Sequence, residues 1–209
     1  MKHLIRFVSF IGLFSMFQLA YAVDLFQTGE TLTADKLNDI DQRIMALEKT
    51  HVIGDIGPAG GWIFYVTADG LHGLEAAPTD QVSAIWGCFG TAISGAASIV
   101  IGAGARNTDD IIRGCPVAGI AAAVADEYIS PSGYIDWYLP TQDELNEMYL
   151  NIGPGSTTIG NVGGFASVGY WSSSENTNGA LAWVQDFLGG GQLVGNKGNP
   201  FGVRAVRAF

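Results

Sequence analysis

The stretch from Asp136 to Tyr149, D-W-Y-L-P-T-Q-D-E-L-N-E-M-Y, changes from an extended segment to a helix within a few residues. Pro140 cannot continue a strand ladder, and Thr141 followed three residues later by Glu144 has the form of a capping box. We therefore expect a helix from Gln142, with apolar residues at helical spacing packed against aromatic residues of the extended segment. These residues are Leu145, Met148, Tyr149 and Ile152 in the helix, and Trp137, Tyr138 and Leu139 before it. The stretch predicts a structural hub and no chemistry of its own.

Residues 1–22 have the pattern of a secretory leader. Lys2 and Arg6 precede an apolar run over 7–19, and Ala20-Tyr21-Ala22 has the small-x-small form of a cleavage site. An uncleaved membrane anchor is the alternative, but the run is shorter than the ~20 residues that a membrane span needs. We expect a secreted, periplasmic or cell-surface protein with no membrane span after cleavage.

The mature chain is predicted to be strongly acidic. The whole chain has 10 Lys and Arg against 20 Asp and Glu, and two of the cations lie in the leader, leaving a net charge of about −12. Such a charge argues against nucleic acid, anionic membranes and heparin-like polyanions as partners. The 29 glycines favour a strand-rich fold with many turns over a helical bundle.

Cys88 and Cys115 are the only cysteines, and in an oxidising compartment a disulfide between them is the default. Such a bridge stabilises the fold by roughly 3 kcal/mol on the chain-entropy estimate. A metal or nucleophile role is the alternative. His51 and His72, the histidines outside the leader, show no ligand-like spacing with either cysteine, and the sequence does not decide whether a metal binds.

Residues 23–52 are predicted to form an extended segment over 23–30 and then a helix capped by Thr33. The helix carries an apolar seam that steps by three and four residues, formed by Leu37, Ile40, Ile44 and Leu47. A helix with so short a seam is only marginally stable by itself. Its apolar side chains must therefore be buried against copies of the same helix or against the domain. We expect a homotrimer or homodimer; a helix packed on its own domain is the alternative.

The domain is predicted to span residues 53–209. Its first residues belong to a glycine-rich linker over 51–61, which leads into the first strand. Strands are expected at 62–66, 71–77, 169–174, 180–188, 192–194 and 202–209, the first two as a hairpin. Residues 81–104 read as a long loop held by the disulfide. Helices are expected after a cap at Asn107 and Thr108, over 117–128, and from Gln142.

Arg204 and Arg207 lie in the last strand, V-R-A-V-R-A-F, and the period of two puts them on opposite faces. One of them should face the interior and pair with a carboxylate such as Asp136, Glu144 or Glu175. We favour a structural salt bridge there, and anion binding is the alternative.

Several motifs, in this order, resemble the Lcl C-terminal domain family, a family of bacterial secreted domains of unknown function. They are G-D-I-G-P-A-G-G-W-I-F-Y (54–65), L-H-G-L-E-A-A-P (71–78), W-G-C (86–88), the hub D-W-Y-L-P-T-x-x-E-L-N-x-M-Y, Y-W-S-S-S-E (170–175), A-W-x-x-x-F (182–187) and the terminal V-R-A-V-R-A-F. The likeness covers about 53–209. It implies an α+β, C-type-lectin-like fold with an antiparallel sheet and two main helices, whose closing strand returns near 62–66. It also implies an adhesin that is trimeric and binds sulfated glycans, although this chain has no collagen-like repeat and is acidic.

The turn after Y-W-S-S-S-E is the best candidate binding site. Glu175, Asn176 and Asn178 offer carboxylate and amide oxygens close in sequence to Trp171 and Trp183. Such groups beside an aromatic ring suit sugar hydroxyls, and the same oxygens could hold Ca²⁺, although no cofactor is required. The alternative is a solvated turn with core tryptophans. Asn107, Asp109 and Asp110 form a second oxygen-rich cluster, which helix capping would explain.

Catalysis has weaker support in the sequence. The serine run Ser172 to Ser174 lacks a G-x-S-x-G context, and Glu144, which could pair with Glu175 as in a glycosidase, has a capping role. We therefore expect a non-enzymatic binding or adhesion module with a glycan or surface ligand. An extracellular glycan-acting enzyme and a structural component of a surface assembly are the alternatives.

Overall fold

The computed structural model describes residues 33–39 and 50–209, and the chain divides into two compact units, Met1–Glu48 and Lys49–Phe209. In the first unit, residues 34–39 are helical. The Thr33 Oγ1 accepts the N–H of Lys36 at 3.4 Å, as expected of an N-cap. Leu37 is 46% exposed. The predicted leader, the extended segment 23–30 and the seam residues Ile40, Ile44 and Leu47 lie outside the described residues.

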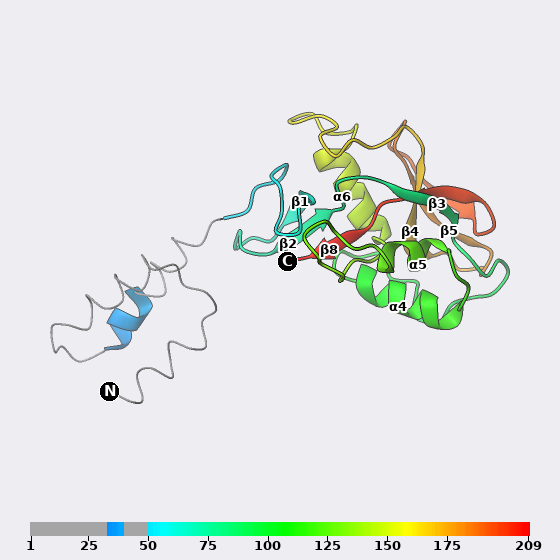
Figure 1. The fold of residues 1–209 in the computed structure, drawn as a ribbon, viewed down its shortest axis with the longest axis horizontal. Helices are drawn as coiled ribbons and strands as arrows, with labels where there is room; N and C mark the ends of the chain where they lie inside the picture. The colour runs from blue at the N-terminus through cyan, green and yellow to red at the C-terminus, as the bar shows by residue number, and fades with distance from the viewer. Residues whose placement is uncertain (1–32, 40–49) are drawn as a thin grey trace. The chain divides into compact units, whose positions relative to one another are not determined.

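The second unit is an α+β domain, as predicted (Figure 1). Its strands are β1 (Trp62–Val66), β2 (Gly73–Ala76), β3 (Gln81–Ile85), β4 (Gly169–Glu175), β5 (Leu181–Asp186), β6 (Gln192–Asn196), β7 (Pro200–Val203) and β8 (Val206–Ala208). Its helices are α4 (Gly104–Gly114), α5 (Ala121–Asp126) and α6 (Gln142–Ile152). No helix among residues 33–39 and 50–209 is long and apolar enough to cross a membrane.

A three-stranded sheet with the order β1-β2-β8 lies beside the point where the described chain enters this unit (Figure 1). The predicted hairpin is confirmed, because β1 and β2 pair antiparallel from Trp62↔Ala76 to Val66↔Gly73. The closing strand β8 pairs with β2, whereas the sequence had placed it near β1. Residues 51–61 are packed onto the domain and are more than a linker: the Gly54 N–H donates to Ile63 O at 2.8 Å, and Ala59 is buried.

A five-stranded sheet has the order β3-β7-β4-β5-β6, antiparallel except for one parallel contact between β4 and β7. The prediction of a loop throughout 81–104 is wrong at its start, because β3 pairs with β7 there. The single predicted strand over 202–209 is also wrong. Arg204 and Ala205 separate β7 from β8, which join different sheets, and a period-two pattern cannot show such a change of sheet.

Helix α6 begins where its sequence predicts, whereas α4 and α5 have other bounds than those predicted. The capping box of α6 is confirmed: Thr141 Oγ1 accepts the Glu144 N–H at 3.2 Å and Glu144 Oε2 accepts the Thr141 N–H at 2.8 Å. Helix α4 starts at Gly104, so the predicted cap at Asn107 and Thr108 is wrong, and both side chains are buried inside the helix. Helix α5 is shorter than predicted, because Gly119, at φ +74°, holds the chain out of the helix before Ile120.

The five-stranded sheet separates two apolar clusters. One cluster contains Trp86, Trp137 and Trp171 with residues of α4 and α5. The other contains Tyr170 and Phe187 with residues of α6 and of the three-stranded sheet. Because neighbouring residues of a strand point to opposite faces, Trp171 and Tyr170 mark the α4–α5 side and the α6 side of the sheet. The predicted disulfide between Cys88 and Cys115 is confirmed, with a Cα–Cα distance of 5.8 Å.

Candidate functional site

Glu75, in the middle of β2, is a fully buried carboxylate that holds the glycine-rich segment before β1. It accepts the N–H of Ala59 at 3.0 and 3.2 Å and that of Gly61 at 2.9 Å. The Nη1 of Arg207 donates to the same carboxylate at 2.8 Å. A buried charge must be paired and hydrogen-bonded to be tolerated, and Glu75 meets both conditions. The sequence analysis did not single it out, although it is the only carboxylate of its apolar strand.

Arg207 also forms the ion pair with Asp136 that the sequence predicted, with two contacts of 2.8 Å. Hydrogen bonding to Arg207 lowers the pKa of Asp136, and the same bond is the main reason that the pKa of Arg207 is raised. The guanidinium also lies 4.3 Å from the centroid of the Tyr134 ring. Arg207 is therefore fully used in joining the last strand to the hub.

Arg204 is buried as well, so the expectation that one of the two arginines faces the interior is too narrow. Its partner is Asp80, with an Nε–Oδ1 distance of 2.7 Å, and Asp80 was not among the predicted partners. The same carboxylate accepts the hydroxyl of Tyr170 at 2.6 Å. The remaining donors of Arg204 reach the carbonyls of Ala77 and Gly163, both at 2.9 Å. Both arginines thus serve structural roles.

Glu144 does more than cap α6. Its Oε1 accepts the N–H of Gly102 at 2.8 Å, which fixes the loop before α4 to the start of α6. Burial raises the pKa of this carboxyl to about 7, against the hydrogen bonds from Thr141 and Gly102 that lower it. All these contacts are structural, and a catalytic pair with Glu175 would need both carboxylates to be freed from their present partners.

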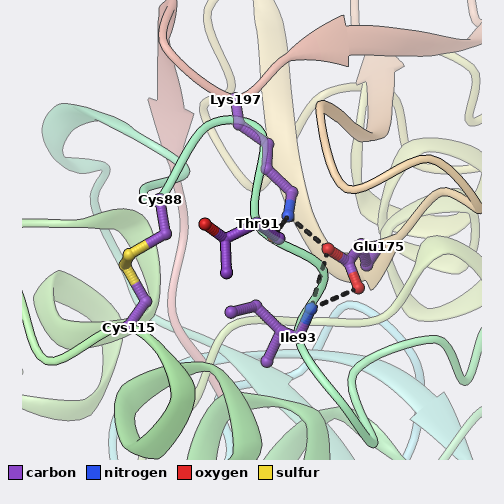
Figure 2. Close-up of a disulfide and its surroundings, with 6 residues drawn as sticks. All are labelled: Cys88, Thr91, Ile93, Cys115, Glu175 and Lys197. Atoms are coloured by element: carbon purple, nitrogen blue, oxygen red, sulfur yellow. Dashed lines mark hydrogen bonds and ion pairs between the residues drawn. A yellow bond between two sulfur atoms is a disulfide. The ribbon is translucent and has the colours of Figure 1, made fainter.

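Glu175 is a buried ion-pair partner (Figure 2). Its carboxylate contacts the Nζ of Lys197 and accepts the N–H of Ile93 at 3.0 and 2.9 Å. Figure 2 shows this group close to the disulfide, with the ammonium of Lys197 also donating to Thr91 O at 3.0 Å. Lys197 lies 4.1 Å from the centroid of the Trp86 ring, and its burial lowers its pKa. Glu175 therefore anchors a loop, and the predicted ligand role would require it to leave Lys197.

Trp171 and the serine run are also inside the fold. Trp171 is fully buried, and its Nε1 donates to Ala84 O at 2.9 Å. Ser172 and Ser174 are buried and donate to the carbonyls of Trp183 and Ser98, at 2.9 and 2.8 Å. His72 is exposed and pairs with Asp69 at 3.0 Å. The described residues therefore contain no Ser–His contact of the kind that activates a serine nucleophile.

Asn176, Asn178 and Trp183, the other candidates, are placed where a ligand can reach them. Asn178 is exposed, and its Oδ1 accepts the N–H groups of Ala180 and Leu181 at 3.1 and 3.2 Å, which shapes the turn. Asn176 is half-buried beside it. Trp183 is partly exposed, and its indole N–H has no acceptor within the described part of the chain. The predicted site is thus divided: Trp171 and Glu175 are structural, and the rest lies at the surface.

The pairing of β5 with β6 places Trp183 in a larger surface that the sequence did not reveal. Cross-strand partners in an antiparallel pair lie on the same face, so Trp183 shares its face with Val194, and Leu181 with Asn196. The next pair, Gln185 and Gln192, continues the row, and Gln192 accepts the side-chain amide of Gln142 at 3.1 Å. Gln185 itself is buried, so it is not part of the surface. We call the accessible residues of this row the β5–β6 face: Leu181, Trp183, Gln192, Val194 and Asn196.

The second oxygen-rich cluster does not form a site. Asn107 is buried, and its Nδ2 donates to Ser98 O at 2.6 Å and to Ser173 Oγ at 3.3 Å. Asp110 pairs with Arg113 on the same helix, and Asp109 is exposed. In residues 33–39 and 50–209, no group of three or more His, Cys, Asp or Glu side chains could hold a metal ion.

Comparisons with known proteins add no assignment to this geometry. No model of a known protein family matches the chain, and a search of curated proteins finds no match.

Proposed function

We propose that this protein is a secreted or cell-surface binding module without enzymatic activity, which binds glycan and self-associates through its N-terminal helix. The leader-like pattern of residues 1–22 supports export, and the disulfide fits an oxidising compartment. The resemblance to the Lcl C-terminal domain family supports a C-type-lectin-like arrangement. In keeping with it, α4 and α6 are the two longer helices of the domain.

The observation that carries this proposal is the contrast between polar groups that are hydrogen-bonded inside the protein and polar groups that are exposed at its surface. The buried carboxylates Glu75, Glu144 and Glu175 each accept backbone N–H groups of a glycine-containing loop, which makes a rigid scaffold. Trp183 stands on that scaffold with an indole N–H that donates to no residue in the described part of the chain. Beside it lie the exposed amides of Asn178, Gln192 and Asn196, whose oxygens accept hydrogen bonds from Leu181, Gln142 and Gly198. Rigid aromatic and amide groups at a surface suit binding more than group transfer.

Binding is tested with the mature protein on an array of neutral and sulfated glycans, with Ca²⁺ and with EDTA. We expect a reproducible signal for at least one glycan class and no change in the mass of that glycan after prolonged incubation. Turnover of any arrayed glycan would refute the non-enzymatic assignment. The absence of any signal at high protein concentration would refute glycan binding itself.

Self-association is tested on the mature chain by light scattering. Replacing Leu37 and Ile44 by Glu puts two charges into the predicted seam, so we expect a dimer or trimer to become a monomer. Replacing the polar residues Asp39 and Asp41 by Asn is the matched control and should leave the mass unchanged. A monomeric unmodified chain would refute self-association through this helix.

A further inference from the structure

The β5–β6 face is uncharged, which is unusual in a chain with a formal net charge of −10. None of its five residues is ionisable, and the charged groups nearest in sequence are occupied. Lys197 and Glu175 are buried against each other, and Asp186 caps the following turn through the N–H groups of Leu188 and Gly189, at 2.9 and 3.1 Å. A ligand on this face meets an indole ring, two aliphatic side chains and amides.

The face is held in place by the sheet. Trp183 pairs with Val194 in β6, and its carbonyl accepts the Ser172 hydroxyl from β4 at 2.9 Å. At one end of the row, Gln142 and Gln192 hydrogen-bond to each other, which ties the face to the first residue of α6. Val194 is 46% exposed and Gln192 and Asn196 are exposed, so the row is accessible along β6. Little ordering is therefore needed when a ligand binds.

We propose that the β5–β6 face is the binding site for a neutral oligosaccharide, with the apolar face of one sugar ring on Trp183 and its hydroxyls on Gln192 and Asn196. This inference rests on the proposed glycan-binding function and specifies its site and ligand class. Amide groups both donate and accept hydrogen bonds, as hydroxyl groups do, and an aromatic ring offers a flat apolar surface.

Charge excludes the sulfated alternative at this face. A sulfated glycan is recognised through Arg and Lys side chains that pair with its anionic groups. The exposed cations Arg106 and Arg113 lie on α4, which packs on the opposite side of the five-stranded sheet, and Lys197 is buried. Within residues 50–209, a polyanion on the β5–β6 face would therefore meet no exposed cation while approaching an acidic domain.

The test is a calorimetric titration of the full mature protein with cellopentaose, maltopentaose, chitopentaose and a heparin hexasaccharide. Three variants are compared: Trp183→Ala removes the ring, Val194→Lys keeps the ring but blocks the position opposite it, and Trp62→Ala is the control. Trp62 is also a partly exposed tryptophan with no indole acceptor, but it lies in the three-stranded sheet. Circular dichroism checks that each variant is folded.

We expect at least one neutral pentasaccharide to bind, with affinity falling at least tenfold in Trp183→Ala and in Val194→Lys and less than twofold in Trp62→Ala. Equal binding by all variants would place the glycan site elsewhere and overturn this inference while leaving the proposed function standing. Binding of the heparin hexasaccharide alone would also overturn this inference and leave the proposed function standing. Loss of self-association in Trp183→Ala, with glycan binding intact, would assign the face to contact between copies. No binding of any probe overturns the inference, and the array then decides the function separately.

Discussion

Trp171 and Trp183, on neighbouring strands of one sheet, have opposite surroundings. Trp171 is fully buried on the α4–α5 side, its ring packs edge-to-face on Phe201 at 4.8 Å, and its N–H donates to Ala84 O. Trp183 points to the other face, is partly exposed and has no N–H acceptor among the described residues. A tryptophan whose N–H is satisfied inside the protein is part of the core, and one with a free N–H at the surface is available to a ligand.

Charged groups follow the same division. In the interior, Glu75, Glu175, Lys197, Arg204 and Arg207 each have an oppositely charged partner, and Glu144 is held by backbone N–H groups instead. The β5–β6 face holds no charge at all. Buried ions add specificity to the fold only when all their hydrogen bonds are made, so they tolerate little change. The β5–β6 face contains no buried ion, so substitutions there do not leave a charge without a partner.

The largest effect is expected from exchanging the two tryptophans for alanine. Trp171→Ala should lower the free energy of unfolding by about 3–5 kcal/mol, because it leaves a large cavity and frees the Ala84 carbonyl. Trp183→Ala should cost less than about 1 kcal/mol, because the ring is partly exposed. Chemical denaturation monitored by far-UV circular dichroism measures both. A similar loss of unfolding free energy in the two variants would show that Trp183 is a core residue and would contradict the difference described above.

A second test uses the two carboxylates that share Arg207. Glu75→Gln keeps the shape but removes the buried charge and weakens the bonds from Ala59 and Gly61, so we expect a loss of about 2–3 kcal/mol. Asp136→Asn removes the exposed partner, whose side chain is 57% accessible, and should cost less than about 1 kcal/mol. Thermal and urea unfolding of both variants give the values. A larger cost for Asp136→Asn would mean that the hub, rather than β2, anchors the last strand.

A third test concerns pH. The pKa of Glu144 is raised from 4.5 in the unfolded chain to about 7 in the fold, so the folded state holds more protons between these values. Stability from this group is therefore greatest at low pH and falls as pH rises from about 4.5 to 7, by up to about 3 kcal/mol. Glu144→Gln should remove this part of the pH dependence in urea titrations at several pH values. Glu147→Gln, on the same helix and also half-buried, is the control and should keep the slope, because Glu147 is not among the groups that shift the pKa of Glu144.

Some long-range contacts could be predicted because few candidates existed. The disulfide follows from having two cysteines in a chain whose first residues have the pattern of a secretory leader. The pair between Arg207 and Asp136 was one of a few combinations of a terminal arginine with a carboxylate near the hub. By contrast, the partner of Arg204 was missed, because Asp80 lies in a turn with no periodicity to place it. The roles of Glu75 and Lys197 were missed because the partner of each lies on another element of the fold.

The candidate site could be predicted only in part. The sequence brought Trp171, Glu175 and Trp183 together as one group, and period-two alternation does place Trp171 and Glu175 on one face of a regular strand. It cannot show which face α4 and α5 cover, nor the irregular pairing between Trp171 and Glu175 in β4. Gln142 and Gln192 are 50 residues apart, and no local signal links them.

The sequence by itself determined the features that depend on neighbouring residues or on a single choice of partner: the capping box at Thr141 and Glu144, the β1–β2 hairpin and the disulfide. Their energies come from contacts within a few residues or from a single available partner. Only the tertiary structure decided which polar groups are hydrogen-bonded in the interior and which are exposed to a ligand. Burial depends on which elements cover a strand, and that is a property of the whole chain packing at once. The hub from Asp136 to Tyr149 is local in origin, whereas the surface beside its helix exists only because β5, β6 and α6 meet there.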